Sequence, residues 1–191
     1  MKNNSIIAIG GLALMLWWLR QGKEKAETLI DNVRGHISNI RSYTGGLYAE
    51  YSDDQLQDTN VYLVIKNFED YWTDEVLVIE ADPTRIKANQ IPHIVTDLRQ
   101  NYSLYQKNLK LYKNEQALVD QGQQRQDGIH IWHNDPGTLE EVLRIFEEGI
   151  DLACDWRDFI YSIQQQLEGK ESADRALESF DELRRSHDVS K

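Results

Sequence analysis

Residues 138–168 read TLEEVLRIFEEGIDLACDWRDFIYSIQQQLE and contain the strongest helical pattern in the chain. Thr138 and Glu141 form a capping box, which is typical of the first turn of a helix. Apolar residues then recur every three or four positions, so they share one side of a helix, and Gly169 ends the pattern. We therefore predict a long amphipathic helix and a mainly α-helical fold around it. The apolar residues are Val142, Phe146, Ile150, Ala153, Trp156, Ile160, Ile163 and Leu167.

A second long helix is predicted over residues 92–121, and a short one over residues 172–185. Together these three helices form the predicted bundle. The apolar side of the 92–121 helix has near-heptad spacing, which is typical of a helix–helix seam. Tyrosine occupies several of its positions, which favours a partly hydrated interface over a dry dimer core. The candidate interface residues are Leu98, Tyr102, Tyr105, Leu109 and Tyr112.

Residues 23–46 are predicted to form a helical stalk before the bundle. Their apolar residues recur at helical spacing on an otherwise polar rod. Gly35 lies within this pattern and indicates a kink or a close packing contact, because glycine is a poor helix former. Gly45 and Gly46 are typical of a helix end. The apolar residues of the stripe are Ala26, Leu29, Val33, Ile37 and Ile40.

A small β-hairpin is predicted within residues 60–80. Residues 60–66 (NVYLVIK) and 75–80 (EVLVIE) are short, rich in β-branched side chains and bounded by polar residues. A helix over residues 55–72 is the alternative, because periodicity does not distinguish the two structures in runs this short. The fold class that we expect is therefore mainly α with a minor β element.

The stretch 3–19 has no charged residue over 17 positions, near the lower limit for a helix that spans a bilayer core. Two tryptophans end it and basic residues follow, as is typical of a membrane interface. We predict a retained single-pass anchor over residues 1–22, with a cleaved signal and a buried soluble helix as alternatives. The anchor residues are Ile6, Ile7, Ile9, Leu12, Leu14, Leu16, Trp17, Trp18 and Leu19.

The charges divide the chain into two parts. Four basic groups and one acidic group give residues 1–25 a net charge of +3, so residues 26–191 carry −14 of the total of −11. This acidic balance argues against nucleic acid as a partner, because phosphate binding needs clustered Lys and Arg. The basic flank of the anchor favours a cytoplasmic carboxyl-terminal part, or its equivalent on the inner side of a viral membrane.

Few residues suggest catalytic chemistry. His130, His133 and Asp135 are weak candidates for a metal site, because residues three apart on a strand point to opposite faces. Cys154 has an acidic neighbour, which does not favour a reactive thiolate. The sequence contains no phosphate-binding glycine loop and no nucleophile-elbow motif, so we predict neither a cofactor nor an enzyme.

The domain order that we expect is an anchor (1–22), a stalk (23–46), an acidic helical domain (47–185) and a flexible tail (186–191). The leading functional hypothesis is a non-enzymatic, membrane-anchored structural or assembly protein. It would dock its acidic domain onto a second copy or a larger complex, with the lipid bilayer and other proteins as partners. The alternatives are a bacteriophage virion structural or ejection protein, and a membrane-tethered metal-dependent enzyme that uses residues 130–135.

Overall fold

The computed structural model describes residues 24–46, 60–77, 86–121 and 136–188. Within these ranges the chain is helical, apart from short connections, and contains no strand. One helix spans residues 24–46. The others are α3 (Asn60–Asp70), α4 (Ile91–Asp120), α5 (Pro136–Glu168) and α6 (Lys170–Asp188). A π-helical segment, η1 (Tyr71–Val76), continues α3, and a 3₁₀ turn, η4 (Ala88–Gln90), leads into α4.

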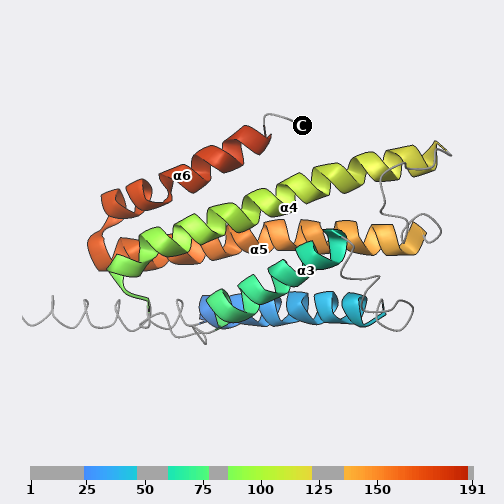
Figure 1. Ribbon diagram of the computed structural model, residues 1–191. Coiled ribbons are helices and arrows are strands. Elements are labelled where there is room, and N and C mark those ends of the chain that lie inside the picture. Colours follow the sequence, from blue (N-terminus) through green and yellow to red (C-terminus); the bar gives the residue numbers. More distant parts are fainter. Residues whose placement is uncertain (1–23, 47–59, 78–85, 122–135, 189–191) are drawn as a thin grey trace, which may run out of the picture.

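Three helices pack together as the sequence predicts. The helices α4 and α5 run side by side in opposite directions, and α6 packs against both (Figure 1). Their bounds agree with the predicted helices 92–121, 138–168 and 172–185 to within three residues at each end. The helix α6 continues to Asp188, so it includes the first residues of the predicted tail. The prediction of a helical bundle is confirmed.

The predicted β-hairpin is wrong. Residues 60–66 lie in α3, and Val76 lies in η1. Ile65, Phe68, Trp72 and Val76 are completely buried, and their spacing of three and four positions places them on one helical face. Burial of this face against the bundle outweighs the preference of β-branched residues for strands. The alternative of a helix is therefore the correct one within residues 60–72.

The predicted stalk belongs to the bundle. The stripe that begins at Ala26 and ends at Ile40 is buried in the same hydrophobic core as α3, α4 and α5. An ion pair of 2.7 Å between Arg41 Nε and Glu69 Oε1 joins this helix to α3. In Figure 1 the 24–46 helix lies on the opposite side of α4 and α5 from α6. An amphipathic helix in water is stabilised by covering its apolar stripe, which the bundle does here.

The predicted membrane anchor, residues 3–19, lies outside the described residues. Among the helices that are described, none combines the length and the apolar character needed to cross a bilayer. The anchor therefore stays a prediction.

Two exposed glycines, one between helices and one inside a helix, test the backbone conformation. Gly169, between α5 and α6, has φ of 89° and donates its N–H to the carbonyl of Gln165 at 2.9 Å. Gly35 lies in the interior of the 24–46 helix, and an added methyl group would meet no atom within 4 Å. The close packing contact predicted at Gly35 is therefore not formed by the described residues.

We predict that Gly169→Ala lowers the free energy of unfolding by about 1 kcal/mol, because L-residues are strained at positive φ. Gly35→Ala should instead raise it by about 0.5–1 kcal/mol through helix propensity. Urea unfolding followed by circular dichroism measures both. Equal effects of the same sign would contradict these two backbone assignments.

Candidate functional site

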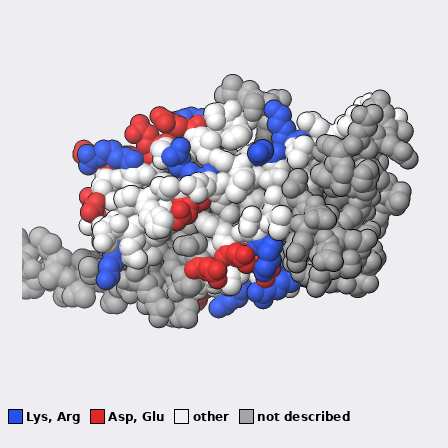
Figure 2. Space-filling view, viewed as in Figure 1, with Lys and Arg blue, Asp and Glu red and all other residues white. Residues whose placement is uncertain are grey.

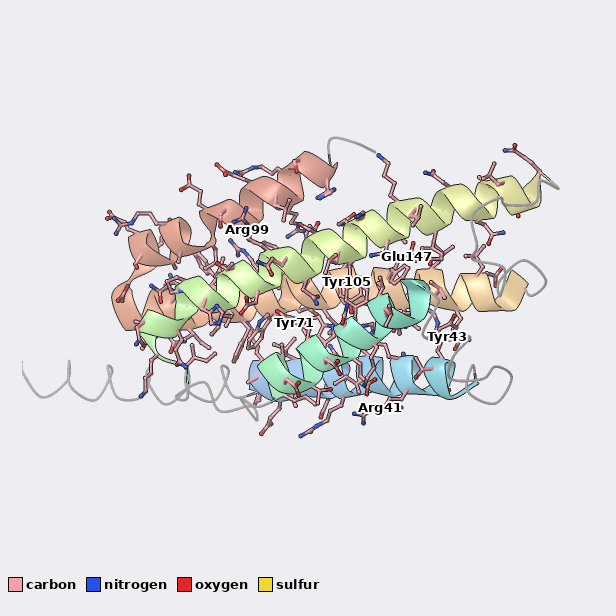
Figure 3. All side chains as sticks on the ribbon, in the orientation of Figure 1. Arg41, Tyr43, Tyr71, Arg99, Tyr105 and Glu147 are labelled. Atoms are coloured by element: carbon pink, nitrogen blue, oxygen red, sulfur yellow. The ribbon has the colours of Figure 1, made fainter. Side chains whose placement is uncertain are left out.

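Four side chains from four helical segments meet in the interior. We call His36, Trp72, Tyr105 and Glu148 the buried polar cluster; they come from the 24–46 helix, η1, α4 and α5 respectively. Trp72 and Tyr105 are completely buried, and His36 is 3% exposed. Figure 3 shows Tyr105 in the middle of the bundle, between α4 and α5. Glu148 is the member that reaches the surface, with a third of its side chain exposed.

The hydrogen bonds of the buried polar cluster form a directed chain. Trp72 Nε1 donates to the Tyr105 hydroxyl at 2.9 Å, and that hydroxyl lies 2.9 Å from His36 Nε2. His36 Nδ1 is 3.2 Å from Glu148 Oε2. An ionised carboxylate only accepts, so Nδ1 carries the imidazole proton and Nε2 accepts the proton of Tyr105. Each hydrogen bond along this series of side chains therefore joins a donor to an acceptor.

Burial also keeps the imidazole of His36 and the phenol of Tyr105 neutral. Burial lowers the pKa of His36, although its hydrogen bond to Glu148 acts in the opposite direction. The nearby Arg144 also lowers the pKa of His36. Burial raises the pKa of Tyr105 well above its ordinary value, and the hydrogen bond from Trp72 opposes this only in part. At neutral pH the cluster thus holds a neutral imidazole against a neutral phenol.

Side-chain shape around Tyr105 is as restrictive as its hydrogen bonds. The ring of Phe68 stacks on the ring of Tyr105 with centroids 3.6 Å apart and an interplanar angle of 8°. On α5, an added Cβ at Gly149 would overlap the Tyr105 ring. The glycine therefore lies mid-helix, where it costs about 1 kcal/mol relative to alanine, because α4 and α5 could not otherwise approach so closely.

At its surface end the cluster is held by two further groups. Asn39 Nδ2 donates to Glu148 Oε2 at 3.0 Å, and Arg144 donates to Glu148 Oε1 at 3.2 Å. Because both imidazole nitrogens and the phenol are already paired, the cluster fixes the relative positions of four helical segments. A buried polar network that is fully satisfied specifies one packing arrangement of the core.

A second feature lies at the surface, between α3–η1 and α4. We call it the acidic groove; it has a volume of about 400 Å³. Asp70, Asp74 and Asp97 give it a negative character. Two of these carboxylates have a basic neighbour: Lys66 Nζ lies 3.2 Å from Asp70 Oδ1, and His93 Nδ1 lies 3.3 Å from Asp97 Oδ2. The lining residues are Asn67, Asp70, Tyr71 and Asp74 on one side and His93, Asp97, Gln100, Asn101 and Leu104 on the other.

One polar group in the wall of the groove has no partner. Asn101 is 5% exposed, and its Oδ1 is buried without a hydrogen bond. Leaving a buried acceptor unpaired costs about 1–3 kcal/mol. Within the described ranges, no group of three or more His, Cys, Asp and Glu side chains is arranged to hold a metal ion.

The residues predicted from the sequence are placed as follows. Leu98, Tyr102, Tyr105 and Tyr112 are buried in the chain's own core, and Leu109 packs against it. The seam of α4 is therefore filled from within the chain by the other helices of the bundle. The metal candidates His130, His133 and Asp135 lie outside the described residues, as do the anchor residues that begin at Ile6 and end at Leu19.

Sequence reasoning missed His36, Gly149 and Asn101. His36 carries a usable signal, because it follows Val33 by three positions and precedes Ile40 by four, on the apolar stripe of its helix. Gly149 and Asn101 carry a weaker one. Each interrupts a helical pattern, and for Gly149 the reason is Tyr105 on a neighbouring helix that is distant in sequence.

Comparison with protein-family models, with curated proteins and with solved structures finds no match to this chain. Its function is therefore inferred from the geometry described above.

We predict that Gly149→Ala lowers the free energy of unfolding by about 1–3 kcal/mol, because the new methyl group must displace the ring of Tyr105. In a Tyr105→Leu background the same change should be neutral or stabilising, since the ring is gone and alanine favours the helix. A double-mutant cycle measured by urea unfolding checks this. An unchanged effect in both backgrounds would show that α4 and α5 do not approach as described.

We also predict that acid weakens the fold through His36. The pKa of the folded imidazole is lowered from 6.5. The unfolded chain therefore binds a proton at a higher pH than the folded chain, and stability falls as the pH drops from 6.5 towards the folded pKa. One such group contributes at most about 1.4 kcal/mol per pH unit.

The measurement is the pH dependence of the unfolding free energy between pH 7.5 and pH 5. His36→Gln should flatten the profile in this interval. The parent chain, measured over the same pH interval, is the reference. If the profile of His36→Gln equals that of the parent chain, the lowered pKa of His36 is refuted.

Proposed function

We propose that this chain is a non-enzymatic assembly protein. In this proposal its acidic helical bundle docks onto a second copy or a larger protein complex at a membrane, to which residues 3–19 attach it. The observation that carries the proposal is that the side chains of the buried polar cluster hydrogen-bond to one another inside the bundle. Its imidazole and its phenol are paired with each other in the interior and are not presented to a substrate at the surface.

Apolar side chains on the outside support a docking role. Leu104 is 43% exposed and Leu111 is 38% exposed, and their separation of seven positions places them on one face of α4. Leu104 also lines the acidic groove. In Figure 2 uncharged side chains cover much of the middle of the described surface, and charged groups form small clusters around them. Apolar surface with a polar rim is typical of protein–protein interfaces.

The division of charge supports the location. Residues 1–25 carry +3 and surround an uncharged stretch, whereas the remainder carries −14. Basic residues beside an apolar segment favour retention on the cytoplasmic side. An anchor of this kind would hold the acidic bundle at the inner side of the membrane, where its groove meets proteins and not lipid headgroups of the same charge.

Membrane extraction tests the tethering part of the proposal. We expect the full chain to stay with the membrane pellet after alkaline carbonate washing. The wash disrupts electrostatic attachment to the membrane surface, but it does not extract an apolar helix from the bilayer. A variant that lacks residues 1–22 is the matched control and should appear in the wash. Release of the full chain together with the truncated one would remove the anchor from the proposal.

A further inference from the structure

We propose that the acidic groove binds the guanidinium group of an arginine side chain from a basic protein partner. The inference deepens the proposed function, since it assigns the docking surface and the chemistry of the partner, and it rests on the chain having a protein partner at all. It does not depend on the membrane anchor.

The carboxylates of the groove come from both of its sides. Asp70 and Asp74 are four positions apart on α3–η1, and Asp97 faces the groove from α4. The lining residues of α4 from His93 to Leu104 extend over about 16 Å at the helical rise of 1.5 Å per residue. This length is suited to an extended or helical segment of a partner. A positive segment is attracted by the three carboxylates, of which Asp74 has no ion pair among the described residues.

Asn101 is an independent indication of a ligand. Asn101 lines the groove and is only 5% exposed, and its Oδ1 accepts no hydrogen bond. A hydrogen-bond donor from a partner in the groove would satisfy this oxygen. Guanidinium offers five N–H donors in one plane, so one group can bind a carboxylate and an amide oxygen together.

The remaining walls favour arginine over lysine. The ring of Tyr71 lines the groove from η1, and Figure 3 shows Tyr71 between α3 and α4. Leu104 adds an apolar contact on the other side. A guanidinium plane stacks on aromatic and apolar surfaces and is less strongly hydrated than an ammonium group. π-Helical turns such as η1 are rare and frequently occur at functional sites.

The experiment is an NMR titration of the isotopically labelled full chain in a non-ionic detergent. The probes are the peptides acetyl-Gly-Arg-Gly-Arg-Gly-amide and acetyl-Gly-Lys-Gly-Lys-Gly-amide, and spermidine. We expect the arginine peptide to shift amide signals of the groove residues and to bind about tenfold more tightly than the lysine peptide. Binding should weaken as salt is added, because the carboxylates of Asp70 and Asp74 are exposed.

Three variants locate the binding. Asp74→Asn with Asp97→Asn removes two groove charges, and Glu178→Gln with Glu182→Gln removes two exposed charges from α6 as the matched control. The groove variant should weaken binding of the arginine peptide about tenfold and the control about twofold or less. Asn101→Leu should weaken it about tenfold without any change of charge. Its melting temperature should equal or exceed that of the parent chain, which shows that the loss is not due to unfolding.

Three results would overturn the inference. The first is equal weakening by the groove variant and the α6 control, which would mean that the peptide senses only the net charge. The second is tighter binding of spermidine or of the lysine peptide, which would mean that the groove does not select guanidinium. The third is no shift at the groove with the arginine peptide. None of them affects the carbonate extraction, so failure of the groove and failure of the membrane tether are separate outcomes.

Discussion

The hydroxyl of Tyr105 lies at the centre of a hydrogen-bonded cluster that joins four of the described helical segments. It accepts the indole proton of Trp72 and donates to the imidazole of His36, which in turn donates to Glu148. A phenol buried without partners would destabilise the core, and so would an imidazole or an indole N–H left alone. Because the four groups come from four helical segments, satisfying them together requires one relative arrangement of those segments. The stacked ring of Phe68 and the space at Gly149 then admit Tyr105 in one orientation.

The same packing that forms the buried polar cluster also forms the acidic groove. On η1, Trp72 points into the core while its neighbour Tyr71 lines the groove. On α4, Tyr105 is buried while its neighbour Leu104 lines the groove. Adjacent residues on a helix project about 100° apart, so fixing the inward pair also sets the positions of the outward pair. The surface that we assign to a basic partner is therefore held in shape by the interior of the bundle.

The elements that the sequence predicts well are those with long periodic patterns. Residues 138–168 repeat their apolar spacing over eight turns or so, and no strand shares that period. Residues 60–66 offer only seven positions rich in β-branched side chains, and their helical form depends on burial of Ile65 and Phe68 against distant helices. The acidic groove and the buried polar cluster could not be predicted from the sequence, for a related reason. His36 and Glu148 are 112 positions apart, and nothing local in either segment indicates that they meet.

The protonation pattern of His36 decides whether the four segments are joined as described, because the directions of its hydrogen bonds to Tyr105 and Glu148 depend on it. A ¹⁵N-resolved NMR spectrum of the imidazole at neutral pH distinguishes the two neutral tautomers and the charged form. We expect a neutral ring with the proton on Nδ1 and an unprotonated Nε2 that accepts from Tyr105. A ring that is protonated at Nε2 at neutral pH, whether charged or neutral, would contradict it.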